Sequence, residues 1–414
     1  MHFRAASEAL RQSRALRMRR ELSTAFRFVS PSEPRIARHL EDYADRAIEI
    51  VSRREWSREP TDVLRSKILP RLTSDQAAPL SQGLAAMRLF ASARLARQHA
   101  MEASRTEFMA GHRSANTVRR AFHLFVDEGR LEAAQQLVRE LEVHHTSVPD
   151  GVPQALRALG CDNPPETRPR LDPQRSHLGN LVRSKRVALI GAAPISAAGE
   201  PPLDDYDCVI RMTPALAQPG AASGSARCDV AYLTTLSQRS AEYLTQSLRG
   251  ERLAFATAES PRLIVMKRAP SRTHLGKIPL MSIPNVRSGA IGSPTSGTQM
   301  IVEILQSDPE SLDILGFNFY TSSMLYRPEV LAQKRLVPAM SGVGRDFQWR
   351  GTELDPAVHA IQWAAHDLAT DFQLVKAILY HNVRVKALGE SHEVLQWTLE
   401  QYFTRFEGLS RGLK

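Results

Sequence analysis

The sequence predicts an all-α region followed by an α/β region with a Rossmann-like, mostly parallel sheet. Residues 1–147 are rich in Ala, Leu, Arg and Glu and poor in Gly and β-branched runs, which favours consecutive helices. Residues 148–182 contain six prolines, a composition typical of an irregular linker. In residues 183–414 short apolar runs alternate with helical stretches, the pattern of a parallel sheet covered on both faces.

The clearest helices of the first region form a hairpin. Ser114 or Asn116 is expected to cap its first helix, and Gly129 fits the position just after the end of that helix. A second helix is predicted over 131–142. The pair is similar to one tetratricopeptide hairpin, but the sequence holds no clear second copy.

The second region is expected to contain six strands and four helices. The run that ends in Gly191 suits a buried parallel strand. The strands are predicted at 186–191, 208–212, 229–233, 262–266, 312–316 and 383–388. The helices are predicted at 240–248, 296–306, 356–380 and 392–406, and one short helix is predicted in the linker at 154–159.

Composition excludes several classes of protein. Of the 414 residues, 43% are hydrophobic and 24% are charged, so the chain is neither wholly disordered nor too small to bury a core. No run approaches the roughly 18 apolar residues that span a bilayer. The first residues lack the apolar core of a secretory signal peptide, which predicts a cytoplasmic protein.

The charge is basic, with 54 Lys and Arg against 44 Asp and Glu, a net charge of +10. This excess suits nucleic acid, anionic lipid or phosphate-bearing ligands. Nucleic acid is not expected, because the charge is diffuse and no aromatic side chains interleave with it. Residues 1–28 hold seven Arg and two Glu, so they form either a basic helix on an anionic inner-membrane face or a solvated helix docked on the helical region.

Neither a disulfide framework nor a metal site is expected. Cys161, Cys208 and Cys228 form no CxxC pair and no metal-ligand spacing. Asp205 and Asp207 have the Asp-x-Asp spacing of metal-dependent glycosyltransferases, but they precede a strand, whereas a metal-bearing pair should follow one. We therefore expect no metal and no cofactor.

Two candidate ligand contacts follow predicted strands, because ligands of parallel sheets bind at the carboxyl ends of the strands. Gly191 allows close backbone approach, but its loop is not GxGxxG, so on its own it is weak evidence and favours a plain strand-to-loop turn. Arg211 can bind a phosphate or carboxylate. Its alternative is a structural ion pair with Asp205, Asp207 or Asp229.

A third candidate precedes the helix predicted at 296–306. Ser293, Thr295 and Ser296 supply hydroxyls there, and Gly297 lies in the first turn. Hydroxyls and unpaired backbone N–H groups at a helix N-terminus form a ready anion site. Ordinary capping by Thr295 or Ser296 would need only one hydroxyl.

Three segments together resemble the motifs of family 29 sialyltransferases. The strand at 186–191 with the run at 206–213 is similar to their large sialyl motif. The run at 293–305, followed by the strand that ends at 316–317, looks like their small sialyl motif, and 366–372 looks like their short His-to-Glu motif. The resemblance spans about half of the chain.

The resemblance implies a sialyltransferase-like enzyme that moves a CMP-linked sugar acid to a glycan or glycolipid hydroxyl, with inversion and without metal. It makes His366 the general base, and Asp371 an anchor for that histidine or its helix. The residues it implies around the nucleotide and phosphate are Gly191, Arg211, Thr213, Thr295, Ser296, Gly297 and Gly316. The chemistry agrees, because a histidine with an unperturbed pKa of ~6.5 suits a base near neutral pH.

The sequence also departs from the family pattern. Ala192 and Thr213 stand where the family has asparagines that bind the nucleotide, and no His-Tyr motif is found between Gly316 and His366. A CMP-Kdo donor is therefore as admissible as CMP-sialic acid. The departures also favour an alternative hypothesis, a helical interaction protein with a catalytically silent nucleotide-binding domain.

Overall fold

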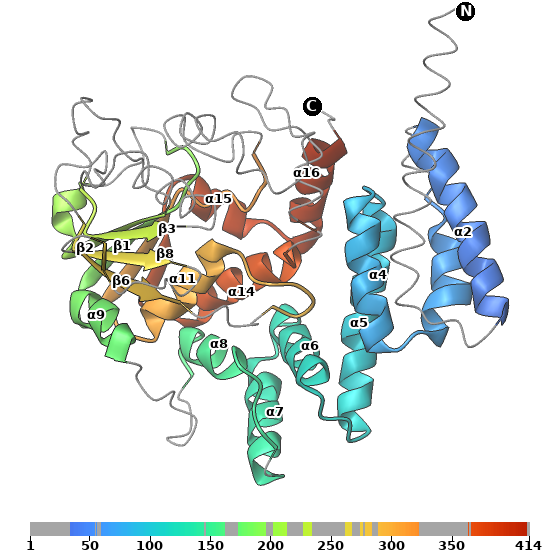
Figure 1. The fold of residues 1–414 in the computed structure, drawn as a ribbon, viewed down its shortest axis with the longest axis horizontal. Coiled ribbons are helices and arrows are strands. Elements are labelled where there is room, and N and C mark those ends of the chain that lie inside the picture. The colour runs from blue at the N-terminus through green and yellow to red at the C-terminus, as the bar shows by residue number, and fades with distance from the viewer. Residues whose placement is uncertain are drawn as a thin grey trace, which may run out of the picture.

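The computed structural model describes a helical region that leads into an α/β sheet (Figure 1). The described residues are 34–53, 55, 59–144, 146–161, 173–195, 202–212, 227–233, 261–266, 274–275, 278–283, 289–322, 363 and 366–411. The basic segment 1–28, Thr213 and the helix predicted at 240–248 lie outside these ranges.

The helical region is built as the sequence predicts. Its elements are α2 (Pro34–Arg53), α3 (Thr61–Val63), a π turn η2 (Leu64–Ile68), a 3₁₀ turn η3 (Leu69–Arg71), α4 (Ser74–Ala86), α5 (Phe90–Met109), α6 (Ala115–Asp127), α7 (Leu131–Val143) and α8 (Val152–Ala158). The hairpin is confirmed: the Ser114 hydroxyl caps α6 by accepting the N–H of Thr117 at 3.1 Å, and Gly129 follows α6 with φ of +70°.

The described residues of the α/β region form an eight-stranded sheet of order β5-β6-β4-β3-β2-β1-β7-β8. Every neighbouring pair is parallel except β5 and β6, which are antiparallel. The strands are β1 (Arg186–Ile190), β2 (Cys208–Met212), β3 (Val230–Leu233), β4 (Leu263–Met266), β5 (His274–Leu275), β6 (Ile278–Ser282), β7 (Ser311–Leu315) and β8 (Val385–Ala387). The predicted α/β class with a mostly parallel sheet is therefore confirmed.

All six predicted strands are present, and the prediction missed β5 and β6. Strand β5 is only two residues long, and β6 contains Pro279, a residue that argues against a strand when the sequence is considered alone. Both strands lie at one edge of the sheet. The described helices of this region are α9 (Pro173–Val182), α11 (Ser296–Leu305), α14 (Leu368–His381), α15 (Glu390–Gln396) and α16 (Leu399–Arg411).

Two predicted helices have different bounds in the structure. Within the helix predicted over 356–380, α14 begins at Leu368 because Asp367 caps it with its side chain, so His366 precedes α14. Of residues 356–365, only Trp363 lies within the described ranges. The helix predicted over 392–406 is two helices, α15 and α16, because Trp397 is extended and the Thr398 hydroxyl accepts the N–H of Gln401. In both places a capping side chain overrides the apolar periodicity of the sequence.

The linker contains more structure than predicted. Helix α8 confirms the short helix expected at 154–159, but α9 also falls within the predicted linker of 148–182. Helix α9 starts at Pro173, and proline is well tolerated in the first turn because it lacks only an N–H that has no partner there.

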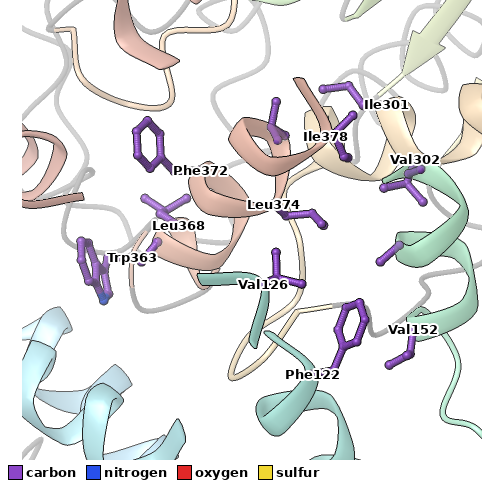
Figure 2. Packing of buried hydrophobic residues seen from close by; sticks show 14 of the residues in the cluster. Phe122, Val126, Val152, Ile301, Val302, Trp363, Leu368, Phe372, Leu374 and Ile378 are labelled. Atoms are coloured by element: carbon purple, nitrogen blue, oxygen red, sulfur yellow. The ribbon is translucent and has the colours of Figure 1, made fainter. Parts of the chain in front are cut away.

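One buried core crosses this linker. Figure 2 shows Phe122 of α6 and Val152 of α8 beside apolar side chains of α11 and α14, including Val302 and Leu374. Farther along, Phe90 of α5 packs against the rings of Trp363 and Phe406 at centroid distances of 6.0 and 5.9 Å. Buried contacts therefore connect the helical region to the α/β region across residues 148–182.

No helix in the part of the chain that the structure describes is long and apolar enough to cross a membrane.

Candidate functional site

The strand order creates a switch point between β1 and β7. From β1 the chain moves outward through β2, β3, β4 and β6, and then returns to β7 on the other side of β1. Ligands of such sheets bind in the crevice outside the carboxyl ends of the strands at this point. The register pairs Ile190 with Leu315, so Gly191 and Gly316 follow their strands side by side.

The two glycines allow the loops after β1 and β7 to touch. The N–H of Gly191 donates to the carbonyl of Leu315 at 2.7 Å, and the N–H of Ala193 donates to Gly316 at 3.1 Å. A Cβ at Gly191 would lie 2.1 Å from the carbonyl oxygen of Gly316, and Gly316 itself has φ of +66°. Both positions therefore need glycine for the fold alone, whether or not a ligand approaches.

The start of α11 packs against the same loop. A Cβ at Gly297 would lie 2.5 Å from the ring of Phe317, the residue after Gly316. Glycine at 297 therefore lets the N-terminus of α11 lie directly against the end of β7. This contact brings the predicted anion loop to the switch point.

A buried carboxylate holds the residue that caps α11. Thr295 caps α11 with its hydroxyl, which accepts the N–H of Thr298 at 3.4 Å, and its own N–H donates to Oδ2 of Asp371 at 2.7 Å. Burial raises the pKa of Asp371 to about 7, although the hydrogen bonds from Thr295 act to lower it. Asp371 therefore binds the loop before α11 through Thr295. Its spacing of five residues does not favour a direct side-chain bond to His366.

His366 is tied to the same loop by its ring. Its Nδ1 lies 2.8 Å from the carbonyl oxygen of Ser293, and the side chain is half-buried. A carbonyl oxygen only accepts, so Nδ1 carries the hydrogen and the neutral ring has its lone pair on Nε2. His366, just before α14, and Asp371, in its first turn, thus contact the loop at two points, Ser293 and Thr295.

Arg211 is placed differently from the other predicted contacts. It lies on β2 opposite Ile190, and its Nε donates to the carbonyl oxygen of Arg227 at 2.8 Å. Asp229, one of its expected partners, pairs with Arg227 at 2.9 Å and with Arg262 at 3.6 Å. This described bond of Arg211 therefore supports the chain before β3.

The structure brings most of the predicted residues to one place. Contacts connect Gly191 to Gly316, the adjacent Phe317 to Gly297, and the loop before α11 to His366 and Asp371. Ser296 is the half-buried first residue of α11. Within the described ranges no group of three or more His, Cys, Asp or Glu side chains could hold a metal ion.

The sequence analysis missed the loop that follows Gly316. Phe319 and Tyr320 both have positive φ, 46° and 64°, which is a rare backbone conformation for aromatic residues. The Oδ1 of the buried Asn318 accepts the N–H of Tyr320 at 3.1 Å, and the hydroxyl of Tyr402 donates to the Phe319 carbonyl at 3.1 Å. Backbone strain of this kind clusters at functional sites. An asparagine among aromatic residues, directly after a strand, was the available signal.

Comparisons of the chain with protein-family models, with curated proteins and with solved structures find no match.

Proposed function

We propose that the chain is a glycosyltransferase that moves a CMP-activated sugar acid to a hydroxyl of a glycan or lipid-linked glycan, with inversion and without metal. The observation that carries the proposal is the hydrogen bond from His366 Nδ1 to the Ser293 carbonyl. It gives the ring a basic Nε2 next to a hydroxyl-rich helix N-terminus. The proposal keeps the cytoplasmic location expected from the sequence.

The chemistry of transfer assigns one role to His366 and another to the N-terminus of α11. As the acceptor oxygen attacks the anomeric carbon and the bond to the CMP phosphate breaks, Nε2 of His366 would take the hydroxyl proton. The departing phosphate gains stabilisation from N–H groups and hydroxyls. Because the N–H of Thr295 goes to Asp371, those of Ser296 and Gly297, which have no partner within α11, would carry this role.

Asp371 then acts through the loop rather than on the substrate. Its carboxyl is buried and bonded to Thr295, so it would position the phosphate-binding turn. Arg211 and Ser296 would contact the charged end of the donor, and Thr213 would lie near the nucleotide, as the resemblance implies. A basic N-terminus on an anionic membrane would bring the enzyme to a lipid-linked acceptor.

Further support comes from the meeting of segments that are distant in sequence. The parts that resemble the large, small and short His-containing sialyl motifs contribute Gly191, the loop before α11, and the first turn of α14. In a doubly wound sheet their meeting point is the position where nucleotides bind.

Two observations favour the alternative, a silent nucleotide-binding domain attached to a helical interaction protein. The Asp371 carboxylate already occupies the Thr295 N–H, and Ala192 cannot supply the amide group of an asparagine. On this hypothesis the chain still binds a nucleotide but performs no transfer.

A thermal-shift screen of the full chain with nucleotides in EDTA tests the proposal, because a ligand that binds the native state raises the melting temperature. CMP and CTP should stabilise the protein more than UDP, GDP or NAD. Equal or greater stabilisation by UDP would contradict the proposal. Release of CMP from CMP-sialic acid or CMP-Kdo then separates the enzyme from the silent domain.

A further inference from the structure

A buried arginine of the helical region reaches the first turn of α14. Arg97 of α5 is 8% exposed along its side chain, and its Nε donates to Oδ1 of Asp367 at 3.0 Å. Its Nη2 donates to the hydroxyl of Thr370 at 2.8 Å and to Oδ2 of Asp127, at the end of α6, at 3.1 Å. One guanidinium therefore links α5, α6 and α14.

The residue that Arg97 binds also sets the turn that presents His366. Asp367 has φ of −79° and ψ of 77°, and the N–H of Leu368 donates to the carbonyl of His366 at 2.9 Å. These values describe an inverse γ-turn centred on Asp367. The carboxylate of Asp367 also accepts the N–H of Thr370 and so caps α14. The direction in which His366 leaves the helix thus depends on Asp367.

The charges favour this arrangement. Arg97 places one cation between the carboxylate of Asp127, whose side chain is 11% exposed, and the buried carboxylate of Asp367. Burial acts to raise the pKa of Asp367, but Arg97 and the hydrogen bonds from Thr370 more than offset it and lower that pKa. Burial raises the pKa of Asp127 to about 6. Of the two carboxyl groups that pair with Arg97, Asp367 therefore stays ionised to a lower pH than Asp127.

We infer that Arg97 is a positioning residue for His366. Through Arg97, the helical region then helps to set the orientation of a side chain in the candidate site. The path runs from the guanidinium to Asp367, through the γ-turn, to the ring that donates to Ser293. Only the kinetic part of this inference rests on the proposed function. The orientation of the ring is a property of the protein without any ligand.

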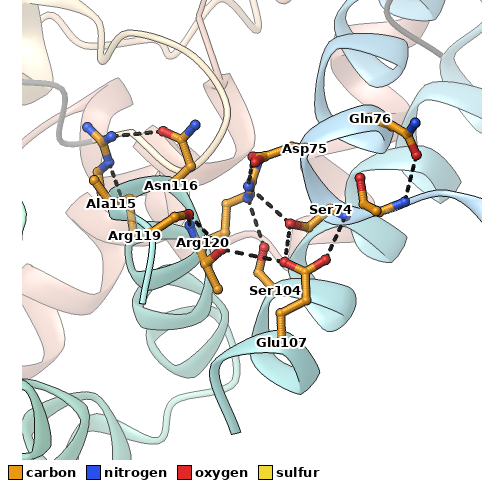
Figure 3. Close-up of polar contacts among 12 residues, drawn as sticks. Ser74, Asp75, Gln76, Ser104, Glu107, Ala115, Asn116, Arg119 and Arg120 are labelled. Carbon is orange, nitrogen blue, oxygen red and sulfur yellow. Dashed lines mark hydrogen bonds and ion pairs between the residues drawn. The ribbon is translucent and has the colours of Figure 1, made fainter. Parts of the chain in front are cut away.

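The chain offers a matched control in Arg120 of α6. Arg120 is 3% exposed along its side chain, donates to the hydroxyls of Ser104 and Ser74, and pairs with Asp75 (Figure 3). These partners lie on α4 and α5, so this network stays inside the helical region. Arg97 and Arg120 are therefore similarly buried and make similar hydrogen bonds and ion pairs. Arg97 contacts the α/β region through α14, whereas the partners named for Arg120 lie within the helical region.

The test compares Arg97→Lys with Arg120→Lys in the full chain. Lysine keeps the buried charge, but it lacks the planar guanidinium with which Arg97 donates to Asp367, Asp127 and Thr370 at once. The readout is the ¹⁵N spectrum of the histidine rings, with the His366 signal assigned from His366→Gln. We expect the Nδ1–H tautomer in the wild type and in Arg120→Lys, and a mixture of tautomers with a changed ring pKa in Arg97→Lys. A wild-type His366 signal in Arg97→Lys would overturn the inference.

A second variant approaches the contact from the other side. Asp367→Asn keeps an oxygen that can cap α14 but removes the ion pair with Arg97, so it should change the His366 signal in the same direction. If Arg97→Lys and Asp367→Asn both fail to fold while Arg120→Lys folds, the pair serves stability alone and the inference is wrong.

Kinetics provide a separate readout. Arg97→Lys should lower the rate of CMP release from the donor by about tenfold with unchanged CMP affinity, since small errors in orientation are costly to catalysis. Should the wild type neither bind CMP nor release it, the proposed function fails, but the His366 spectrum still decides the role of Arg97.

Discussion

Two buried polar clusters of this chain differ in what they connect. The Arg120 cluster joins α4, α5 and α6, and its partners lie within residues 74–120. The cluster around the first turn of α14 joins Arg97 on one side to Ser293 and Thr295 on the other. The first cluster holds neighbouring helices together. The second links the helical region to the edge of the sheet where we propose that the donor binds, so its loss should change more than stability.

The largest effect is expected from removal of the helical region. A fragment that begins at residue 178 would expose the faces of α11 and α14 that pack against Phe122 and Val152 (Figure 2). We expect it to be insoluble or unfolded, judged by circular dichroism and gel filtration beside the full chain. A soluble fragment that binds CMP would show that the division at 148–182 separates two independent domains.

Replacement of the proposed base should abolish most turnover. His366→Ala is expected to reduce CMP release or transfer by about 10² to 10⁴ and to leave CMP affinity nearly unchanged, as for loss of a general base. His99→Ala is a suitable control, because its ring contacts the Leu72 carbonyl within the helical region. Near wild-type turnover in His366→Ala would assign His366 to structure and favour the silent domain.

The stability of the protein should depend on Asp371 between pH 4 and 7. Its pKa rises from an ordinary 3.8 to about 7 on folding, so the folded state binds the proton more tightly, and this contribution to stability is lost as the pH rises through 7. Asp371→Asn stays neutral and should be more stable than the wild type at pH 8, by on the order of 2 to 4 kcal/mol, but not at pH 4.

Urea unfolding at both pH values measures this difference. Asp62→Asn, which changes an exposed carboxyl of the helical region, is the control. An equal effect of Asp371→Asn at pH 4 and pH 8 would contradict the raised pKa of Asp371.

The smallest effects are expected at the donor contacts. Arg211→Ala and Ser296→Ala should each weaken binding of a CMP-sugar by about 1 to 3 kcal/mol, the range for a charge-assisted or ordinary hydrogen bond. Ser307→Ala, just beyond the other end of α11, should have no effect on calorimetric titrations. Unchanged donor affinity with a lower melting temperature in Arg211→Ala would assign that side chain to a structural role, such as its contact with Arg227.

Sequence alone predicted the features that depend on neighbouring residues. Apolar runs located six strands, and the hydroxyls before α11 identified a capped N-terminus, because caps and strands are local. Asp367, the partner of Arg97, lies 270 residues away, so no spacing pattern in the sequence could predict this pair. The turn at Asp367 was also not predicted, because apolar periodicity gives no sign that this residue turns the chain and caps α14. Long-range polar contacts therefore account for most of what was missed at the site.

Hydrogen exchange of the full chain with and without CMP tests the central claim most directly. We expect saturating CMP to slow exchange in segments 293–298, 316–321 and 366–371, which meet at the ends of β1 and β7, and to leave the peptides around Ser74 and Arg120 unchanged. Absence of protection in those three segments, or protection confined to the Arg120 cluster, would contradict a nucleotide site at this edge of the sheet.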